Sequence, residues 1–159
     1  MTGSHATSDA YVIRQEDPGQ PDVVELLKHG EAHSETLYPA ESSHHLLLDG
    51  LRKPGVHFFV ARDDNGIALA TGAVVIQDGW AEIKRMWVEP SARGRGIARR
   101  VLETLIAQAR GAGVTALRLE TGVASHAALA LYEQVGFQRC PPFADYRPDP
   151  LSVFMERAI

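Results

Sequence analysis

The sequence predicts a single α/β (α+β) domain with a mixed central sheet of about seven strands, flanked by about four helices. Its 159 residues suffice for one domain with its own core. In the first half, short strand patterns follow one another through tight turns, which predicts antiparallel pairing. In the second half, a helical pattern separates two strand patterns, and such a crossover joins parallel strands. We expect residues 1–9 to be a disordered leader and residues 10–159 to form the domain.

The chain is expected to open with a strand and two helices. "YVIRQ" (Tyr11–Gln15) alternates apolar and polar residues as a strand does, and "DVVELLKHGEAH" from Asp22 groups its apolar residues on one helix face. A second helix is expected over residues 42–52, because Ser42 can cap its start and the following "KPG" ends it.

Three β-rich runs follow these helices. The turns "DDNG" (residues 63–66) and "QDG" (residues 77–79) separate them, and both sequences favour a tight reversal of the chain. We therefore expect an antiparallel meander in this part of the sheet. Its strands span residues 56–62, 67–76 and 80–88.

The hydrophobic pattern changes after residue 90. Apolar residues at helical spacing run from Ile97 to Ala109, and "GAG" from Gly111 ends this helix. "TALRLET" (residues 115–121) is the strand that the crossover places parallel to strand 80–88. The remaining elements are a helix with its apolar face on Ala128, Leu131, Tyr132 and Val135, closed by Gly136, and a tail strand over residues 152–157.

Composition restricts the partners and the location that we expect. The 16 basic residues against 20 acidic ones give a net charge of −4, which argues against a nucleic-acid or membrane-surface partner. No apolar run reaches the roughly 18 residues of a membrane span, and the first ten residues lack the pattern of an export signal. The single cysteine, Cys140, cannot form an internal disulfide, so we expect a cytoplasmic protein.

The stretch "SARGRGIA" links strand 80–88 to the next helix and has the composition of an anion-binding turn. The first N–H groups of a helix are unpaired and carry a partial positive charge, and glycines let phosphate oxygens approach them. A Walker loop is excluded because its lysine is missing. A dinucleotide-binding fingerprint fails because Arg99 stands where a third small residue is needed. An ordinary glycine-rich loop with a solvated basic face is the alternative for this stretch taken alone.

The turn resembles the pyrophosphate-binding motif of the GNAT acetyltransferase superfamily, Q/R-x-x-G-x-G/A, which Arg93, Gly96 and Ala98 satisfy. "LETGVASHAALALYEQVGF" is similar to the second half of the acetyl-CoA site in this family. "EIKRMWV" and "DPLSVFMER" resemble its bacterial small-molecule branch. Ser125 departs from the family, which often has Asn at this position, although a serine hydroxyl can still cap the following helix.

The resemblance implies a sheet whose parallel pair splays apart around acetyl-CoA, the cosubstrate. It implies that the backbone of Met86, Trp87 and Val88 pairs with the pantetheine arm, beside a bulge that exposes the N–H of Met86 or Trp87. Taken alone, the side chains of Met86 and Val88 favour the core. The other cofactor-binding residues that the family implies are Arg93, Gly94, Arg95, Gly96, Ile97, Ala98, Ser125 and Tyr132.

Two residues are candidates for catalysis. The resemblance places Tyr132 beside the cofactor sulfur, where its hydroxyl would assist the departing thiolate, whereas its spacing alone favours a core aromatic. Glu82 is similar to the glutamate base of histone-acetylating members, and it shares a strand face with Met86 if no bulge intervenes. A salt bridge to Lys84 or Arg85 is the alternative for Glu82, and an ordered water is the alternative base.

The family implies transfer of the acetyl group to a primary amine by direct attack in a ternary complex, and the motifs favour a small-molecule acceptor. A non-catalytic acyl-CoA-binding or regulatory domain is the alternative. No metal is expected, because His29 and His33 lack an evident third ligand. Dimers are common in the superfamily, so we also consider a homodimer. The segments expected to roof the acceptor site contain Glu35, Tyr38, Tyr146 and Asp149.

Overall fold

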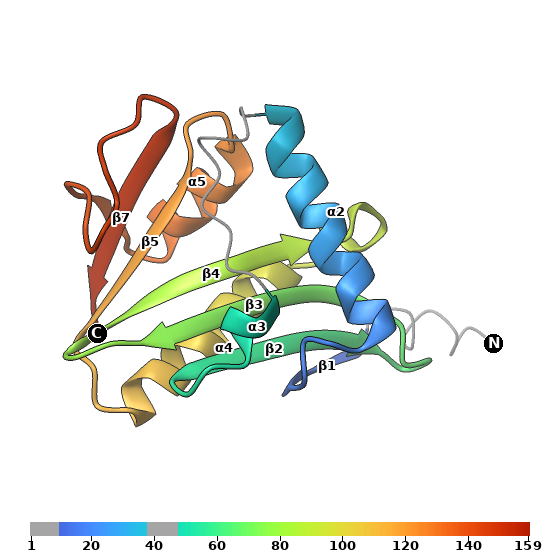
Figure 1. Ribbon diagram of the computed structural model, residues 1–159. Helices are drawn as coiled ribbons and strands as arrows, with labels where there is room; N and C mark the ends of the chain where they lie inside the picture. The colour runs from blue at the N-terminus through green and yellow to red at the C-terminus, as the bar shows by residue number, and fades with distance from the viewer. Residues whose placement is uncertain (1–9, 38–47) are drawn as a thin grey trace.

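The computed structural model describes residues 10–37 and 48–159, with side chains described at 10–33 and 48–159 (Figure 1). The strands are β1 (Tyr11–Gln15), β2 (Val56–Asp63), β3 (Ala68–Ile76), β4 (Trp80–Val88), β5 (Ala116–Gly122), β6 (Gln138–Arg139) and β7 (Ser152–Ala158). The helices are α2 (Pro21–Leu37), α3 (Leu48–Leu51), α4 (Ile97–Gly111) and α5 (His126–Gln134), with a short 3₁₀ helix, η2 (Pro90–Ala92), after β4.

The described strands form one seven-stranded sheet in the order β1-β2-β3-β4-β5-β7-β6. The strands from β1 to β4 pair antiparallel with their neighbours, as do β5 with β7 and β7 with β6. Only β4 and β5 run parallel, joined by the crossover through α4. The predicted mixed sheet with one parallel pair is confirmed.

The parallel pair comes apart halfway along its length. Pairing runs from Trp80 opposite Ala116 to Ile83 opposite Leu119 and ends there, although β4 continues to Val88. Beyond this point β5 stays paired with β7 along its whole length, so the sheet divides into two arms (Figure 1). This divergence confirms the splay that the family resemblance implied.

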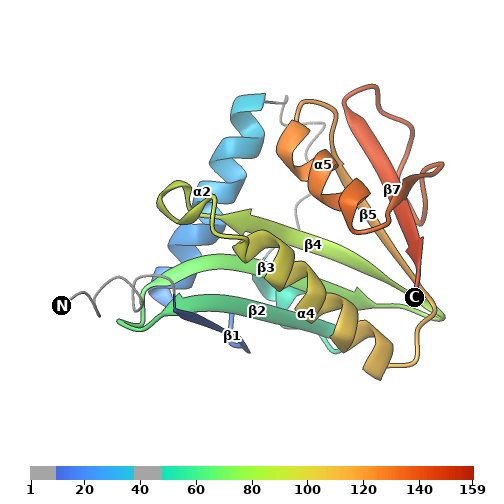
Figure 2. The same ribbon diagram turned by 180° about the vertical axis from the view of Figure 1, so that it is seen from behind.

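Helices cover both faces of the sheet (Figures 1 and 2). On one face, α4 contributes a buried stripe with residues four positions apart, such as Val101 and Leu105, and α5 adds Leu129 and Tyr132 to the same core. On the other face, α2 packs Val23, Leu26 and Leu27 against β2 and β3. Full burial of one such aliphatic side chain stabilises the fold by about 1.5–3 kcal/mol.

Most predicted elements appear within one or two residues of their expected bounds, but α2 extends to Leu37, four residues beyond the predicted stretch that ends at His33. Within the second predicted helix, the structure describes the part that contains α3, and residues 42–47 of that prediction lie outside the described residues. The leader expected over residues 1–9 also lies outside them. Within the described part of the chain, no helix is both long and apolar enough to cross a membrane.

Candidate active site

Strand β4 contains a β-bulge at the point where it leaves β5. Thr71 on β3 pairs with Trp87, but Ala73 pairs with Lys84, so two residues of β4 stand opposite Gly72 alone. These two residues are Arg85 and Met86. The bulge that the family resemblance implied is therefore present, at the root of the splay.

Side chains from neighbouring strands and helices hold this bulge. Arg85 adopts a left-handed φ of 58°, and its carbonyl accepts a 2.8 Å hydrogen bond from the Thr71 hydroxyl, which is 1% exposed. The Arg85 guanidinium contacts the Glu31 carboxylate on α2 at 3.3 Å. Gly72 is required opposite the bulge, because a Cβ there would lie 2.6 Å from a Val101 methyl carbon and 3.0 Å from the Met86 sulfur.

The bulge exchanges the faces of β4, which corrects one expectation. Ala81 and Ile83 belong to the core beneath α4, so Glu82 between them points to the α2 face. Beyond the bulge, Met86 packs against the α4 core. Trp87 instead faces α2, where Gly30 lies against its ring. Glu82 and Met86 are therefore on opposite faces, because the extra residue reverses the alternation.

The last residues of β4 direct backbone groups toward the splay. The Glu89 N–H donates to the Leu69 carbonyl at 2.9 Å, which makes the neighbouring pair of Ala70 and Val88 a non-hydrogen-bonded pair. The N–H and C=O of Val88 consequently point away from β3, toward the arm that β5 has left. An amide-containing chain can pair with such an edge as a strand does.

The glycine turn follows directly after η2 and begins α4. Gly94 and Gly96 have φ values of 81° and 74°, and a Cβ added at either would meet no atom within 4 Å. Gly96 is the N-cap of α4, and the Arg100 N–H is the donor that reaches its carbonyl. Space is therefore open beside both glycines at the start of α4, where a helix has unpaired N–H groups, an arrangement that fits a diphosphate.

Arg93 contacts the end of β4. Its Nε donates to the Val88 carbonyl at 3.0 Å, and its guanidinium carbon lies 4.9 Å from the centre of the Trp87 ring. The Trp87 indole N–H in turn donates to Glu89 at 2.8 Å, and His29 of α2 contacts the same carboxylate at 2.9 Å. These contacts tie the end of β4 to α2 and to the turn.

Tyr132 is placed by α5 against the core on the α4 side. It is 6% exposed, and its ring meets Phe137 edge-on with centroids 5.8 Å apart. Burial, and to a smaller degree the Glu120 carboxylate, raise the pKa of the Tyr132 phenol above its ordinary value. The residue is thus a core aromatic by packing. Its phenol is also a weaker acid than a free one.

Ser125 stands at the N-cap of α5, as predicted, but its side chain makes no capping hydrogen bond. Its φ and ψ of −85° and 67° differ from the extended backbone typical of a capping serine. The expectation that its hydroxyl caps the helix is therefore wrong.

Glu82 and two partners form a compact polar cluster on the α2 face. The Tyr146 hydroxyl donates to Glu82 Oε2 at 2.5 Å, and the Lys84 ammonium lies 3.3 Å from the same oxygen. Lys84 Nζ also donates to the Tyr146 hydroxyl oxygen at 2.9 Å. The Glu82 side chain is only 7% exposed. The alternative of a salt bridge to Lys84 is thus realised, while Arg85 pairs with Glu31 instead.

The loop that carries Tyr146 packs on the sheet through aromatic rings. Phe143 and Phe154 lie 5.1 and 5.4 Å from the Tyr146 ring centre. Burial, followed by the hydrogen bond to Glu82, raises the pKa of the Tyr146 phenol. Asp149 ends this loop, where its carboxylate accepts the Leu151 N–H at 2.8 Å, so it has a structural task here.

The remaining predicted site residues are not part of this cluster, or they lie outside the residues that the structure describes. Glu35 is on the last turn of α2, where side chains are not described, and Tyr38 lies outside the described residues. The His33 ring lies against the Trp87 ring at a tilt of 49°, with ring centres 5.4 Å apart. Within residues 10–37 and 48–159, no group of His, Cys, Asp and Glu side chains could hold a metal ion.

Thr71 and Lys84 are functional candidates that sequence analysis did not propose. Lys84 was considered only as a salt-bridge partner of Glu82, although residues two positions apart on a strand share a face. No sequence pattern around Thr71 indicates its role, because its hydroxyl bonds a carbonyl on the neighbouring strand.

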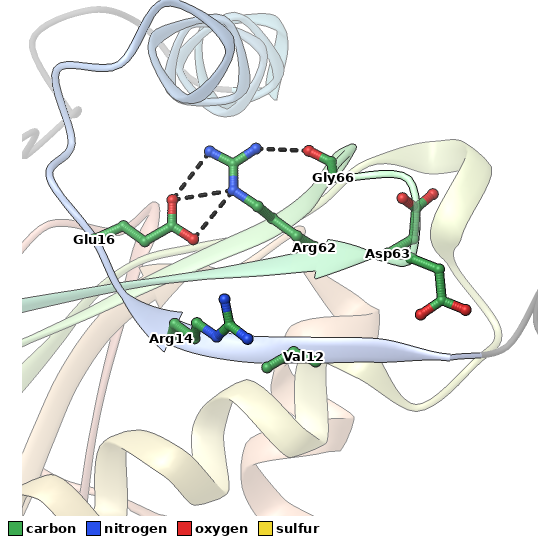
Figure 3. A pocket seen from close by; sticks show the side chains of 7 residues that line it. Val12, Arg14, Glu16, Arg62, Asp63 and Gly66 are labelled. Atoms are coloured by element: carbon green, nitrogen blue, oxygen red, sulfur yellow. Dashed lines mark hydrogen bonds and ion pairs between the residues drawn. The ribbon is translucent and has the colours of Figure 1, made fainter.

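A separate hollow of about 290 Å³ lies at the β1 edge of the sheet, away from the splay (Figure 3). Val12, Arg14, Glu16, Arg62, Asp63, Asp64 and Gly66 line it. Arg62 bonds Glu16 at 3.0 Å, Asp22 at 2.6 Å and the Gly66 carbonyl at 2.8 Å. The hydrogen bonds to Asp22 and then to Glu16 raise the pKa of Arg62. They join β1, β2 and α2, so the guanidinium serves the fold.

Comparisons with known proteins agree with this geometry. The model of the Acetyltransferase (GNAT) family matches residues 21–137. IAA acetyltransferase from Azospirillum brasilense is 46% identical over 149 residues, which cover 92% of this chain and 97% of that protein.

Solved structures share the fold over nearly the whole chain. A protein from Klebsiella pneumoniae subsp. pneumoniae, assigned to the acyl-CoA N-acyltransferases, is 35% identical with a TM-score of 0.81 and covers 94% of this chain and 98% of its own. PaiA N-acetyltransferase from Thermoplasma acidophilum, solved in complex with coenzyme A, is 16% identical with a TM-score of 0.74, over 94% and 99% of the two chains. The chain therefore belongs to the GNAT family and is an acetyl-CoA-dependent N-acetyltransferase.

Proposed function

We propose that the enzyme acetylates a primary amine on a small molecule, by direct attack of that amine in a ternary complex. The observation that carries this proposal is the splay between β4 and β5, with the glycine turn at one end and Glu82 at its root. Glu82 is 6% exposed, and the loop held by Phe143 and Tyr146 contacts it. This confined approach favours a small acceptor over a folded protein.

The residues of the turn and of β4 fit acetyl-CoA. We assign its diphosphate to the backbone amides of residues 95–98, over the open space at Gly94 and Gly96, with attraction from Arg93 and Arg95. Ile97 anchors this turn, since it is 1% exposed in the core. The edge of β4 over Met86, Trp87 and Val88 would pair with the pantetheine arm, and Ser125 and Tyr132 would line its reactive end.

Three groups of the chain have separate roles in the reaction. Acetyl-CoA supplies an acetyl group activated as a thioester. Glu82 accepts the proton that the amine loses. Trp87 pairs with Thr71 on β3, which leaves the Met86 N–H at the bulge as the donor for charge that develops on the carbonyl oxygen. The Tyr132 hydroxyl donates a hydrogen bond to the leaving thiolate, and its raised pKa favours such a bond over complete proton transfer.

Binding of CoA and turnover of amines test this proposal directly. CoA at about 100 times its dissociation constant should stabilise the folded state by about 2.7 kcal/mol, seen as a rise in Tm. A free-thiol assay with acetyl-CoA across a panel of small primary amines should then show turnover. A panel that includes a peptide with a free N-terminus distinguishes the classes, and preference for that peptide would contradict a small-molecule acceptor.

Gly96→Ala should weaken CoA binding by about tenfold or more, because the added methyl group fills the space that phosphate oxygens need. The left-handed φ of 74° should also cost about 1–2 kcal/mol of folding free energy. Gly113→Ala is the matched control, since Gly113 has a φ of 83° and equally open space at the other end of α4. Equal Tm shifts with CoA for both variants would contradict the assignment of the diphosphate.

Thr71→Val should lower kcat by about tenfold or more. Without the Thr71 hydroxyl, the Arg85 carbonyl loses this hydrogen bond and the bulge is held less firmly. The buried carbonyl left without its donor should cost about 1–3 kcal/mol of stability. Thr104→Val is the control, since the Thr104 hydroxyl also donates to a carbonyl, at 2.9 Å, but on the surface of α4. A kcat equal to that of the control would show that the bulge needs no such support.

A further inference from the structure

We propose that Lys84 and Tyr146 are positioning residues, which hold one oxygen of Glu82 so that its other oxygen meets the acceptor amine. This inference rests on the proposed function, in which Glu82 accepts the proton from that amine. Neither residue touches the reacting atoms in this scheme. Both act through the Glu82 carboxylate.

The direction of each hydrogen bond in the cluster is determined by its chemistry. An ammonium group can only donate, so Lys84 donates to the Tyr146 hydroxyl oxygen at 2.9 Å. The hydroxyl proton then points to Glu82 Oε2, which accepts it at 2.5 Å. The raised pKa of Tyr146 keeps this proton in place. The chain of donors runs from Lys84 through Tyr146 to Glu82, and hydrogen bonds in such a chain strengthen one another.

Both contacts fall on the same oxygen of Glu82. Lys84 Nζ lies 3.3 Å from Oε2, the oxygen that also accepts from Tyr146. Within the part of the chain that the structure describes, both hydrogen-bond and ion-pair contacts of the Glu82 carboxylate fall on Oε2 and none on Oε1. Because the carboxylate is planar, fixing Oε2 by two donors also fixes the direction in which Oε1 points. That oxygen is left to take the amine proton.

The surroundings make this arrangement rigid. The side chains of Glu82 and Lys84 are 7% and 17% exposed, so solvent screens their interaction less than it would on the surface. Phe143 packs edge-on against both Tyr146 and Trp80, the latter at 5.5 Å. The loop thus cannot move Tyr146 without losing these ring contacts.

Two charged side chains of β5 act on the cluster, Arg118 and Glu120, and the negative charge of Glu120 contributes to the raised pKa of Tyr146. Arg118 stands opposite Glu82 in the parallel pairing, and its guanidinium carbon lies 4.9 Å from the centre of the Trp80 ring. Its own carboxylate partner is Glu156, at 3.7 Å. Arg118 therefore adds positive potential beside Glu82 but makes its contact elsewhere, and Lys84 is the cation that touches the base.

The test uses the full-length enzyme with acetyl-CoA and the amine that gives the highest turnover in the panel. Lys84→Met and Tyr146→Phe should each lower kcat by about tenfold or more, with the KM for acetyl-CoA unchanged within about twofold. Lys84→Arg should recover most of the lost kcat, because it keeps the charge and the donors. Lys28→Met on the surface of α2 and Tyr11→Phe on β1 are the matched controls, and both should keep the wild-type kcat.

Double variants decide whether these residues act through Glu82. In a Glu82→Gln background, Lys84→Met and Tyr146→Phe should have almost no further effect on kcat. The same tenfold loss in both backgrounds, or a wild-type kcat in both single variants, would overturn the inference while leaving the role of Glu82 intact. A Glu82→Gln enzyme as fast as wild type would overturn this inference together with the role of Glu82 as the base, whereas no turnover with any amine would overturn the proposed function itself. Tyr146→Phe removes one oxygen atom only, so it remains informative if Lys84→Met fails to fold.

Discussion

Tyr132→Phe is expected to lower kcat by about two orders of magnitude or more while CoA binding is retained. The phenylalanine ring preserves the packing against Phe137 and the α4 core, so only the hydroxyl is removed. The departing thiolate then lacks its hydrogen-bond donor, and the loss should appear in kcat rather than in the KM for acetyl-CoA. Steady-state kinetics and the Tm shift with CoA measure the two effects separately.

The control for this change is Tyr11→Phe, because Tyr11 lies on β1 at the far edge of the sheet. Its kcat should equal that of the wild type. If Tyr132→Phe also keeps the wild-type kcat, Tyr132 is a core aromatic without a catalytic task. If its Tm falls by many degrees and CoA no longer raises it, the hydroxyl supports the fold instead.

Glu82→Gln should have a comparably large effect on turnover. The amide keeps the shape of the carboxylate but cannot accept a proton at neutral pH, and loss of a general base costs about 10²–10⁴-fold in rate. The amide also leaves Lys84 without its carboxylate in a site that is largely buried, so a loss of folding stability of about 1–3 kcal/mol is expected. Kinetics at saturating amine, together with thermal unfolding, separate these two consequences.

Glu156→Gln is a suitable control for Glu82→Gln, since Glu156 is also a strand glutamate that pairs with a cation, at 3.7 Å from Arg118, but its side chain is 50% exposed. It should turn over amines at the wild-type rate. A kcat for Glu82→Gln within about threefold of the wild type would identify an ordered water, rather than this carboxylate, as the base.

Local patterns in the sequence were sufficient for most of the secondary structure. The period-2 alternation in Tyr11–Gln15 and the helical spacing from Ile97 to Ala109 each depend on neighbours in the chain, and both elements appear as predicted. The glycine turn also follows from local chemistry, because Gly94 and Gly96 adopt the left-handed φ values that other residues avoid.

Local sequence patterns predicted less of the acceptor side of the site. Tyr146 could be placed only as one of several residues in a proline-rich loop, since such a loop has no periodicity that orients a side chain. Its approach to Glu82 joins residues 64 positions apart in the chain. Lys84 was considered as a partner of Glu82, but its second bond, to Tyr146, required the folded loop.

The sequence by itself determined the order of the elements, the single parallel pair and the open-backbone turn at the start of α4, because each follows from spacing and residue type over short distances. Only the tertiary structure decided which face each residue of β4 occupies. The bulge at Arg85 and Met86 depends on a hydroxyl from β3 and on the packing of Gly72 against α4, and these contacts exist only in the folded sheet. One extra residue in a strand reverses every side chain beyond it, so Glu82 and Met86, which spacing alone places together, face opposite sides of the molecule.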